Sequence, residues 1–285
     1  MVTAYHLTMP DVRTTSVVFA SPHSGRDYSW GFVHRSTLDE RTLRSSEDAF
    51  VDQLFAAAPL HGAPLLAAKA PRAWLDVNRS ADELDPALIQ GVRKSSHNPR
   101  VASGLGVVPR VVANGRAIYR GKLSRAEADA RIRDVWHPWH EALATLLSDS
   151  RALFGEAILI DCHSMPHEAI ESISHPRGQR PEIVLGDRFG AAAGSDIVDR
   201  IEAAFAAAGL RVARNAPFAG AFVTQHYGRP SRKQHVVQIE IDRALYMNEQ
   251  AVRPNNNFDD FRALIDRVVA EISQIGCNDL PMAAE

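Results

Sequence analysis

Two histidines and three acidic residues, widely spaced along the chain, are the side chains best suited to carry chemistry. His23 and His163 lie where apolar runs give way to polar residues, Glu47 and Asp48 are adjacent acids, and Glu240 interrupts an apolar segment. Two imidazoles and one carboxylate form a ligand set for a catalytic Zn²⁺ ion that keeps a fourth position for water. A further carboxylate can then act as the general base.

The strands expected around these residues predict where they meet. The β-branched run at 16–20 predicts a strand that ends just before the first histidine, and the apolar run at 157–160 predicts a buried strand that leads into the second. Residues 236–241 alternate, so Glu240 shares a strand face with Gln238. Because ligands bind beyond the carboxyl ends of the strands in an open α/β sheet, we expect the candidate residues to converge there.

Strand-like runs alternate with helical patterns along the whole chain, which predicts an α/β fold with a largely parallel sheet. Further strands are expected at residues 64–68, 73–77, 182–185 and 210–213. Helices are expected from Ser45–Ser46 with the two acids in the first turn, from Ser124 with a kink at Pro138, at 195–208 and at 258–272. Residues 80–122 and 164–181 are expected to be irregular, within a single domain over 1–285 that ends in a flexible tail at 276–285.

Composition excludes several classes of protein. The chain has 285 residues, 45% of them hydrophobic and 23% charged, which is unlike collagen or a disordered chain. A formal net charge of −2 gives nucleic acid no global electrostatic reason to bind. Two cysteines, Cys162 and Cys277, are too few for a disulfide framework or a four-cysteine zinc site. With no signal-like or membrane-spanning run, we expect a cytoplasmic protein that binds a small molecule.

Six short motifs together allow a comparison with known protein families. They are Ser-Pro-His-Ser-Gly at 21–25, Ser-Glu-Asp at 46–48, Trp-Leu-Asp-Val-Asn-Arg at 74–79, Asp-Cys-His-Ser at 161–164, Leu-Gly-Asp at 185–187 and Gln-Ile-Glu-Ile at 238–241. Together, and in this order, they resemble the N-formylglutamate amidohydrolase family, also called N-formylglutamate deformylases. Residues 76–79 are also similar to the Asp-Leu-Asn-Arg motif of aspartoacylase and its relatives in the zinc carboxypeptidase-like superfamily. The resemblance implies a three-layer α/β/α sandwich with a mixed, largely parallel sheet, like that of zinc carboxypeptidases.

The resemblance also implies a zinc ion, or another divalent metal, held by His23, an acidic residue and His163, with Glu240 as the catalytic glutamate. The superfamily's usual His-x-x-Glu spacing is absent, since Arg26 stands three residues after His23. The acidic ligand must therefore come from elsewhere. The family pattern favours Asp48, with Glu47 as the alternative and Asp27 as a weaker third candidate.

Substrate-binding residues follow from the same resemblance, because the Asn-Arg pair of the superfamily holds the substrate carboxylate. Arg79 is the leading cation for a dianionic substrate, with Arg72 and Arg26 behind it, since a guanidinium suits bidentate carboxylate binding. Asn78 can donate a neutral hydrogen bond. Asp161, two residues before His163, either orients that imidazole or caps a neighbouring loop.

Other reactive side chains receive plainer interpretations. Cys162 is expected to be a buried small residue, because adjacent residues on a strand point to opposite faces. His137 and His140 are expected on a packed, partly polar helix face, with His140 able to approach the pocket. Surface positions are expected for His167, His175, His226 and His235.

The function that the resemblance implies is hydrolysis of N-formyl-L-glutamate to formate and L-glutamate, the last step of one bacterial histidine-degradation route. Two alternatives stay open. One is a deacylase of the same chemistry with another acyl group or amino acid, and the other is a non-catalytic metal- or ligand-binding protein on the same fold. Glu240 separates catalysis from binding, because binding alone does not require a base.

Overall fold

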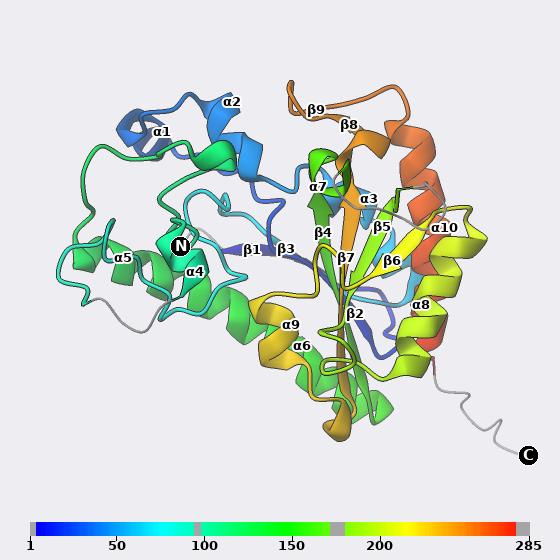
Figure 1. Ribbon diagram of the computed structural model, residues 1–285. Coiled ribbons are helices and arrows are strands. Elements are labelled where there is room, and N and C mark those ends of the chain that lie inside the picture. The colour runs from blue at the N-terminus through cyan, green and yellow to red at the C-terminus, as the bar shows by residue number, and fades with distance from the viewer. Residues whose placement is uncertain (1–3, 94–97, 172–179, 278–285) are drawn as a thin grey trace, which may run out of the picture.

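A seven-stranded mixed sheet forms the centre of the computed structural model, which describes residues 4–93, 98–171 and 180–277 (Figure 1). The strand order is β1-β3-β2-β4-β7-β5-β6. Strands β3, β2, β4 and β7 run parallel to one another, β6 is parallel to β5, and the β1–β3 and β5–β7 pairs are antiparallel. The strands are β1 Tyr5–Thr8, β2 Val17–Ser21, β3 Leu65–Ala68, β4 Ala157–Met165, β5 Ile183–Gly186, β6 Val212–Arg214 and β7 Gln234–Asp242.

Helices cover both faces of this sheet, and a small hairpin of β8 Met247–Asn248 and β9 Arg253–Pro254 follows β7. The α-helices are α1 Trp30–Arg35, α2 Glu40–Leu43, α3 Val51–Leu54, α4 Pro99–Ala102, α5 Arg125–Arg131, α6 His137–Phe154, α7 Glu168–Glu171, α8 Ser195–Ala207, α9 Phe222–Tyr227 and α10 Phe258–Ile275. The described part of the chain contains no helix long and apolar enough to span a membrane.

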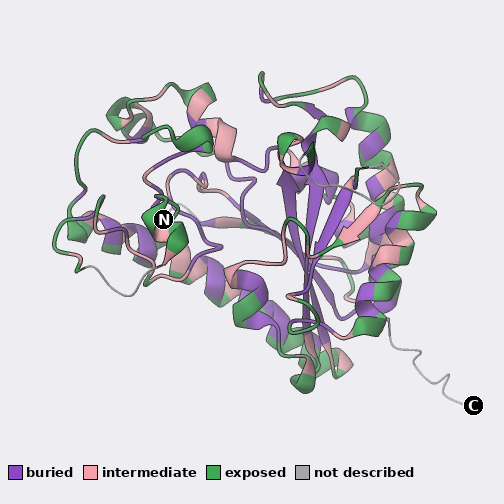
Figure 2. Ribbon diagram, viewed as in Figure 1, coloured by how far each residue is buried: buried purple, intermediate pink, exposed green. Residues whose placement is uncertain are grey.

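Alternation along the strands divides the core into two layers. On β2, Val17 and Phe19 pack in a cluster with α3, α8 and α10, whereas Val18 and Ala20 pack in a second cluster with α6. Figure 2 shows the central strands buried and the outward helix faces exposed. The predicted α/β fold with a mixed, largely parallel sheet is therefore confirmed. Its likeness to zinc carboxypeptidases stays a prediction.

Strand β4 begins with apolar residues and carries polar ones near its end, and these polar residues position the site. Its fully buried first half packs Leu159 against α6, and two residues later the same face carries Asp161 and then His163. Register places Asp161 beside Gln238 and His163 beside Glu240 on parallel β7. Four polar side chains thus share one sheet face at the carboxyl ends of two neighbouring strands.

Two local predictions are wrong. Residues 73–77 form turns rather than a strand, because the amides of Trp74 and Leu75 both donate to the Pro71 carbonyl. The acids at 47 and 48 also do not open a helix. Ser45 and Ser46 donate their hydroxyls to carbonyls of the preceding turn, so the acids lie in the loop before α3.

The kink predicted at Pro138 takes the form of a π-helical turn over residues 132–136, directly before α6. Proline lacks an amide hydrogen, so the regular α-helical ladder is interrupted near it. Ser124 caps α5 as predicted, since its hydroxyl accepts from the Glu127 amide at 3.1 Å. Of the tail predicted at 276–285, residues 278–285 lie outside the described residues.

Candidate metal centre and active site

A cavity of about 610 Å³ opens beyond the carboxyl ends of β2, β4 and β7. Strands β4 and β7 contribute His163 and Glu240 to its wall, and the loop after β2 contributes His23. The long connection after β3 adds Arg72, Asp76, Asn78 and Arg79 among others. The expected convergence at the carboxyl edge of the sheet is therefore what the structure shows.

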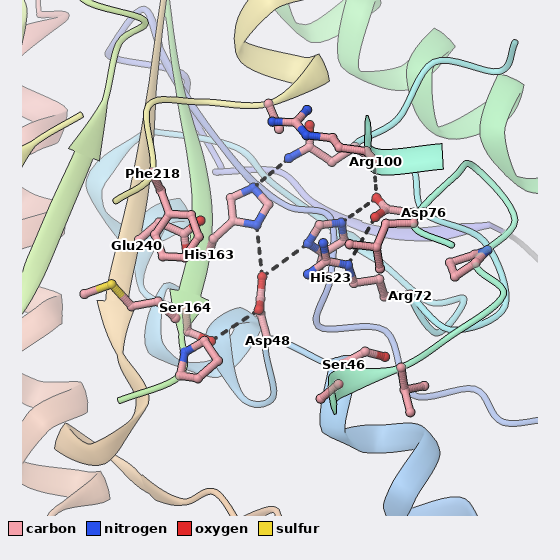
Figure 3. Close-up of a pocket in the computed structure, with 18 of the residues that line it drawn as sticks. His23, Ser46, Asp48, Arg72, Asp76, Arg100, His163, Ser164, Phe218 and Glu240 are labelled. Carbon is pink, nitrogen blue, oxygen red and sulfur yellow. Dashed lines mark hydrogen bonds and ion pairs between the residues drawn. The ribbon is translucent and has the colours of Figure 1, made fainter. Parts of the chain in front are cut away.

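His23, Asp48 and His163 form a buried cluster in this cavity (Figure 3). Asp48 Oδ2 lies 3.3 Å from His23 Nδ1 and 2.9 Å from His163 Nδ1. One ligand atom from each residue lies within 4.8 Å of the other two. Two imidazole nitrogens and a carboxylate oxygen that converge in this way are a donor set suited to a divalent metal such as Zn²⁺.

Close backbone contacts hold the two ends of this cluster together. The Asp48 amide donates to the His23 carbonyl at 3.0 Å, which ties the acidic loop to the loop after β2. Gly25 lets that loop pass directly over the chain after β3, since a Cβ atom there would meet the Ala70 carbonyl oxygen at 2.1 Å. A larger residue at this position would push His23 away from the cluster.

The far nitrogen of each histidine faces a carboxylate. His23 Nε2 lies 2.7 Å from Asp76 Oδ1, and His163 Nε2 lies 3.0 Å from Asp161 Oδ1. At His23 this carboxylate can hold the proton on Nε2 and leave the Nδ1 lone pair for a metal. At His163 the amide nitrogen of Asn78 also lies 3.2 Å from Nε2, and the oxygens of Asp161 have no hydrogen-bond partner in the described part of the chain, so Asp161 lies at ion-pair distance only. Asp76 is a residue that sequence reasoning missed as a separate candidate, although it lies inside the motif at 74–79.

Asp48 is held in its ionised form from both sides. Its Oδ1 accepts from Arg243 Nη2 at 2.9 Å and from the Ser164 hydroxyl at 3.4 Å. Burial alone would raise the pKa of Asp48, but the hydrogen bonds and charges of the two histidines outweigh burial and hold the pKa well below its usual range. Arg243 is a second missed residue, although it follows β7 at the same edge as the other candidates.

Glu240 lies in the same cavity, but outside the cluster of His23, Asp48 and His163. Its side chain is buried, and its Oε1 accepts from Gln238 Nε2 at 2.7 Å. Burial raises the pKa of Glu240 to about 7, and the charge of Asp48 adds to the rise while His163, Arg72 and Arg243 oppose it. A carboxyl group with a pKa near neutral pH is suited to take and release protons during a reaction.

The Asn78-Arg79 pair reaches the cavity from the loop after β3. Asn78 Oδ1 accepts from the Val223 amide at 2.8 Å, so its amide nitrogen points the other way, 3.2 Å from His163 Nε2. Arg79 donates only to carbonyls, those of Leu105 at 3.0 Å and Asn78 at 2.7 Å. Among the described residues no carboxylate forms an ion pair with Arg79, although the charges of Asp76 and Glu83 act on it from nearby.

Comparison with known proteins identifies the family. A model described as N-formylglutamate amidohydrolase matches residues 15–247. The chain belongs to the N-formylglutamate amidohydrolase family. It is similar to an N-formylglutamate deformylase of Pseudomonas aeruginosa, with 31% identity over 82% of this chain and 83% of that protein. Its identity to the N-formylglutamate deformylase of Pseudomonas putida is 28%, over 82% of each chain.

Solved structures agree with this placement. A crystal structure of N-formylglutamate amidohydrolase from Ralstonia eutropha JMP134 superposes with a TM-score of 0.89 at 33% identity, covering 96% of this chain and 99% of that one. The gene product Atu2144 from Agrobacterium tumefaciens has a TM-score of 0.64 at 17% identity over 96% of each chain, which shows a shared fold. The predicted family resemblance is confirmed, and this member of the N-formylglutamate amidohydrolase family is an enzyme.

Three candidates lie away from the cavity of this family member. Arg26 pairs with Asp52 at 3.1 Å, with its side chain 44% exposed, so the structure does not bring it to the site. Glu47, the alternative ligand, is buried but turns to Arg44 at 3.1 Å. Asp27 is 55% exposed and lies 3.6 Å from Lys69. Arg72 does line the cavity, where it pairs with Asp76 at 3.1 Å.

The remaining histidines and cysteines have structural surroundings. Cys162 is buried in the core cluster on the opposite face of β4 from His163, as predicted. His140 is buried behind the loop that carries Asn78 and Arg79, with its Nε2 at 2.9 Å from the Val77 carbonyl. The surface position predicted for His235 is wrong, because this residue lies in β7 and is buried. His137 and His226 are exposed, His167 is half-buried, and His175 lies outside the described residues.

Proposed function

We propose that this enzyme hydrolyses N-formyl-L-glutamate to formate and L-glutamate, with zinc or another divalent metal held by His23, Asp48 and His163 and with Glu240 as the general base. One observation carries the proposal. In a member of this family, a buried three-ligand cluster and a separate buried glutamate line the same cavity. The names of the two Pseudomonas relatives support this choice of substrate.

The roles of the residues follow from their geometry. A zinc ion, when bound, supplies a Lewis acid that polarises the formyl oxygen and makes water more acidic. Glu240 accepts a proton from water on Oε2, because its Oε1 is already held by Gln238. As the C–O bond to the formyl carbon forms and the C–N bond breaks, Glu240 passes this proton to the departing amine nitrogen.

Substrate carboxylates are assigned to the part of the cavity wall formed by the loop after β3. Arg79 brings to this wall a guanidinium with no contact ion pair to any described residue, and Asn78 directs its amide nitrogen into the site beside His163. Arg72 extends the positive potential, although its Nε is engaged with Asp76. A carboxylate on this wall leaves the N-formyl end of the substrate towards the metal cluster and Glu240.

A substrate panel tests this proposal. Formate release from N-formyl-glutamate, N-formyl-aspartate and N-formyl-leucine is compared with acetate release from N-acetyl-glutamate, and metal content is measured on the same protein. We expect kcat/KM to be highest for N-formyl-glutamate, with activity lost after chelation and restored by zinc. Preference for the acetyl compound would favour another deacylase, and no turnover of any compound would favour a binding protein. The place of this reaction in histidine degradation stays a prediction.

A further inference from the structure

Gln238 is a buried polar side chain of the cavity wall to which the proposed reaction assigns no role. It lies two residues before Glu240 on β7, so both side chains project from the same face of the sheet. Its exposed fraction is 4%. A buried carboxamide needs partners for its oxygen and its nitrogen, since an unpaired buried polar group is costly.

The two partners of Gln238 fix the orientation of its amide. The backbone amide of Ala221 donates to Gln238 Oε1 at 3.1 Å, and Gln238 Nε2 donates to Glu240 Oε1 at 2.7 Å. A backbone N–H is always a donor, so the oxygen of Gln238 must face Ala221. The nitrogen is therefore directed at Glu240. In a flipped amide the nitrogen would face the Ala221 N–H, another donor, and the oxygen would face Glu240 Oε1, another acceptor.

The donor at Ala221 is itself held in place. It ends the segment 217–221, which lines the cavity and packs Phe218 near Met165 and Val184. The Ala219 carbonyl accepts from the Arg188 amide at 2.8 Å. Gly186 allows the close crossing, because a Cβ atom there would meet the Gly220 nitrogen at 2.7 Å. Gln238 thus connects a fixed wall of the cavity to the glutamate.

Charged groups face Glu240 from several other elements. His163 comes from β4, Asp48 from the loop before α3, Arg72 from the loop after β3 and Arg243 from the turn after β7. Arg72 and Arg243 are cations with flexible side chains, and either could attract the Glu240 carboxylate into another orientation. Gln238 holds Oε1 of this carboxylate with a neutral donor, and no described residue forms a hydrogen bond with Oε2.

We propose that Gln238 is a positioning residue that fixes Glu240 through Oε1 and directs Oε2 at the attacking water. The inference rests on the proposed function, in which Glu240 is the base. The hydrogen bond from Gln238 holds the Glu240 carboxylate in one orientation. Loss of that bond therefore lowers the rate of the proton-transfer step, while substrate binding at Arg79 and Asn78 is left intact.

Gln238→Met tests this role, because methionine has a similar length but no donor. We expect kcat to fall about 10- to 100-fold and KM to stay within about twofold, since the lost interaction acts on the reacting group. Gln238→Glu keeps the length of the side chain but replaces the donor nitrogen with a carboxylate oxygen, so kcat should fall at least as far while KM again stays within about twofold.

Gln234→Met is the matched control. Gln234 lies on the same strand and donates Nε2 to the Tyr227 carbonyl at 2.7 Å, but it is not among the residues that line the cavity. We expect its kcat and KM to match the wild type. An unchanged kcat in Gln238→Met, an increase confined to KM, or unfolding of both Gln238 variants beside a folded control would overturn the positioning role. Lack of formate release by the wild type would instead refute the proposed function.

Discussion

The two walls of the cavity are built in different ways. One wall belongs to the sheet and includes His163, Gln238 and Glu240, of which His163 and Glu240 are register partners across β4 and β7. Their spacing follows from strand alternation and interstrand pairing alone. Such positions are rigid, because Gln238 and Glu240 are paired with β4 on one side and β5 on the other, and His163 is paired with β7.

The other wall is a loop held by hydrogen bonds from distant segments. The Val77 carbonyl contacts His140 at 2.9 Å, the Arg79 carbonyl accepts from Trp136 at 2.9 Å, and Asn78 is oriented by the Val223 amide. These bonds come from α6, from the π-helical turn before it and from α9. From this contrast we propose that the strand wall carries reacting groups, while the loop wall binds the substrate.

The largest expected effect concerns Asp48, whose carboxylate joins the histidine of the loop after β2 to the histidine of β4. In Asp48→Ala the metal loses a ligand, and we expect affinity for zinc to fall by more than about 100-fold, beyond the loss usual for an outer partner of a ligand. Zinc affinity and formate release are the measurements. Glu47→Gln is the matched control and should retain zinc; equal loss in both variants would contradict the assignment of the acidic ligand.

The loop wall is probed by Arg79→Lys. Lysine keeps the charge but loses the fork that holds a carboxylate, so KM for N-formyl-glutamate should rise about 10- to 100-fold with a much smaller change in kcat. Steady-state kinetics give both constants. Arg26→Lys, outside the cavity, should leave KM unchanged. If Arg79→Lys lowered kcat and spared KM, the division between the two walls would be wrong.

A smaller effect is expected behind the loop wall. His140→Leu leaves the Val77 carbonyl without its partner, which should cost about 1–3 kcal/mol of unfolding free energy and raise KM several-fold. Burial lowers the pKa of His140 to about 3, so the wild-type contact should not titrate between pH 5 and 8. Denaturant unfolding and steady-state kinetics check this. His226 is exposed, so His226→Leu should change neither the unfolding free energy nor KM. A wild-type KM in His140→Leu would show that His140 does not support the loop wall.

The sequence predicts the strand wall of the cavity better than the loop wall. Alternation and continuous apolar runs locate β2, β4 and β7, so His163 and Glu240 can be placed at one edge of the sheet from the sequence alone. Residues 73–77 are mispredicted as a strand because their apolar side chains suit either state. Hydrogen bonds to the Pro71 carbonyl decide the outcome, and they have no periodic signature.

Pairing between distant charged groups is equally invisible in the sequence. Arg243 lies 195 residues from Asp48, and only the folded chain shows that they bond. The same holds for Asp76, whose contact with His23 depends on how two loops cross. The orientation of Gln238 depends on the backbone of segment 217–221, which no local pattern fixes.

The smallest expected effect is on the free energy of unfolding, and it tests the burial of Glu240 in the strand wall. Burial raises the pKa of Glu240 to about 7 in the folded chain, above the value of about 4.3 in an unfolded one. The folded state therefore binds more protons between these values, and Glu240 lowers stability as pH rises through that window. In metal-free protein, Glu240→Gln should be more stable than the wild type at pH 8 and equal to it near pH 4; a difference that does not change with pH would contradict this.

The most direct test of the whole account is the turnover of zinc-loaded Glu240→Gln. The substitution keeps the shape of the side chain and leaves His23, Asp48 and His163 intact, so zinc content and KM should match the wild type. Loss of the base should lower kcat for formate release by about 10²- to 10⁴-fold. Full zinc with a wild-type kcat would contradict the assignment of Glu240 as the general base.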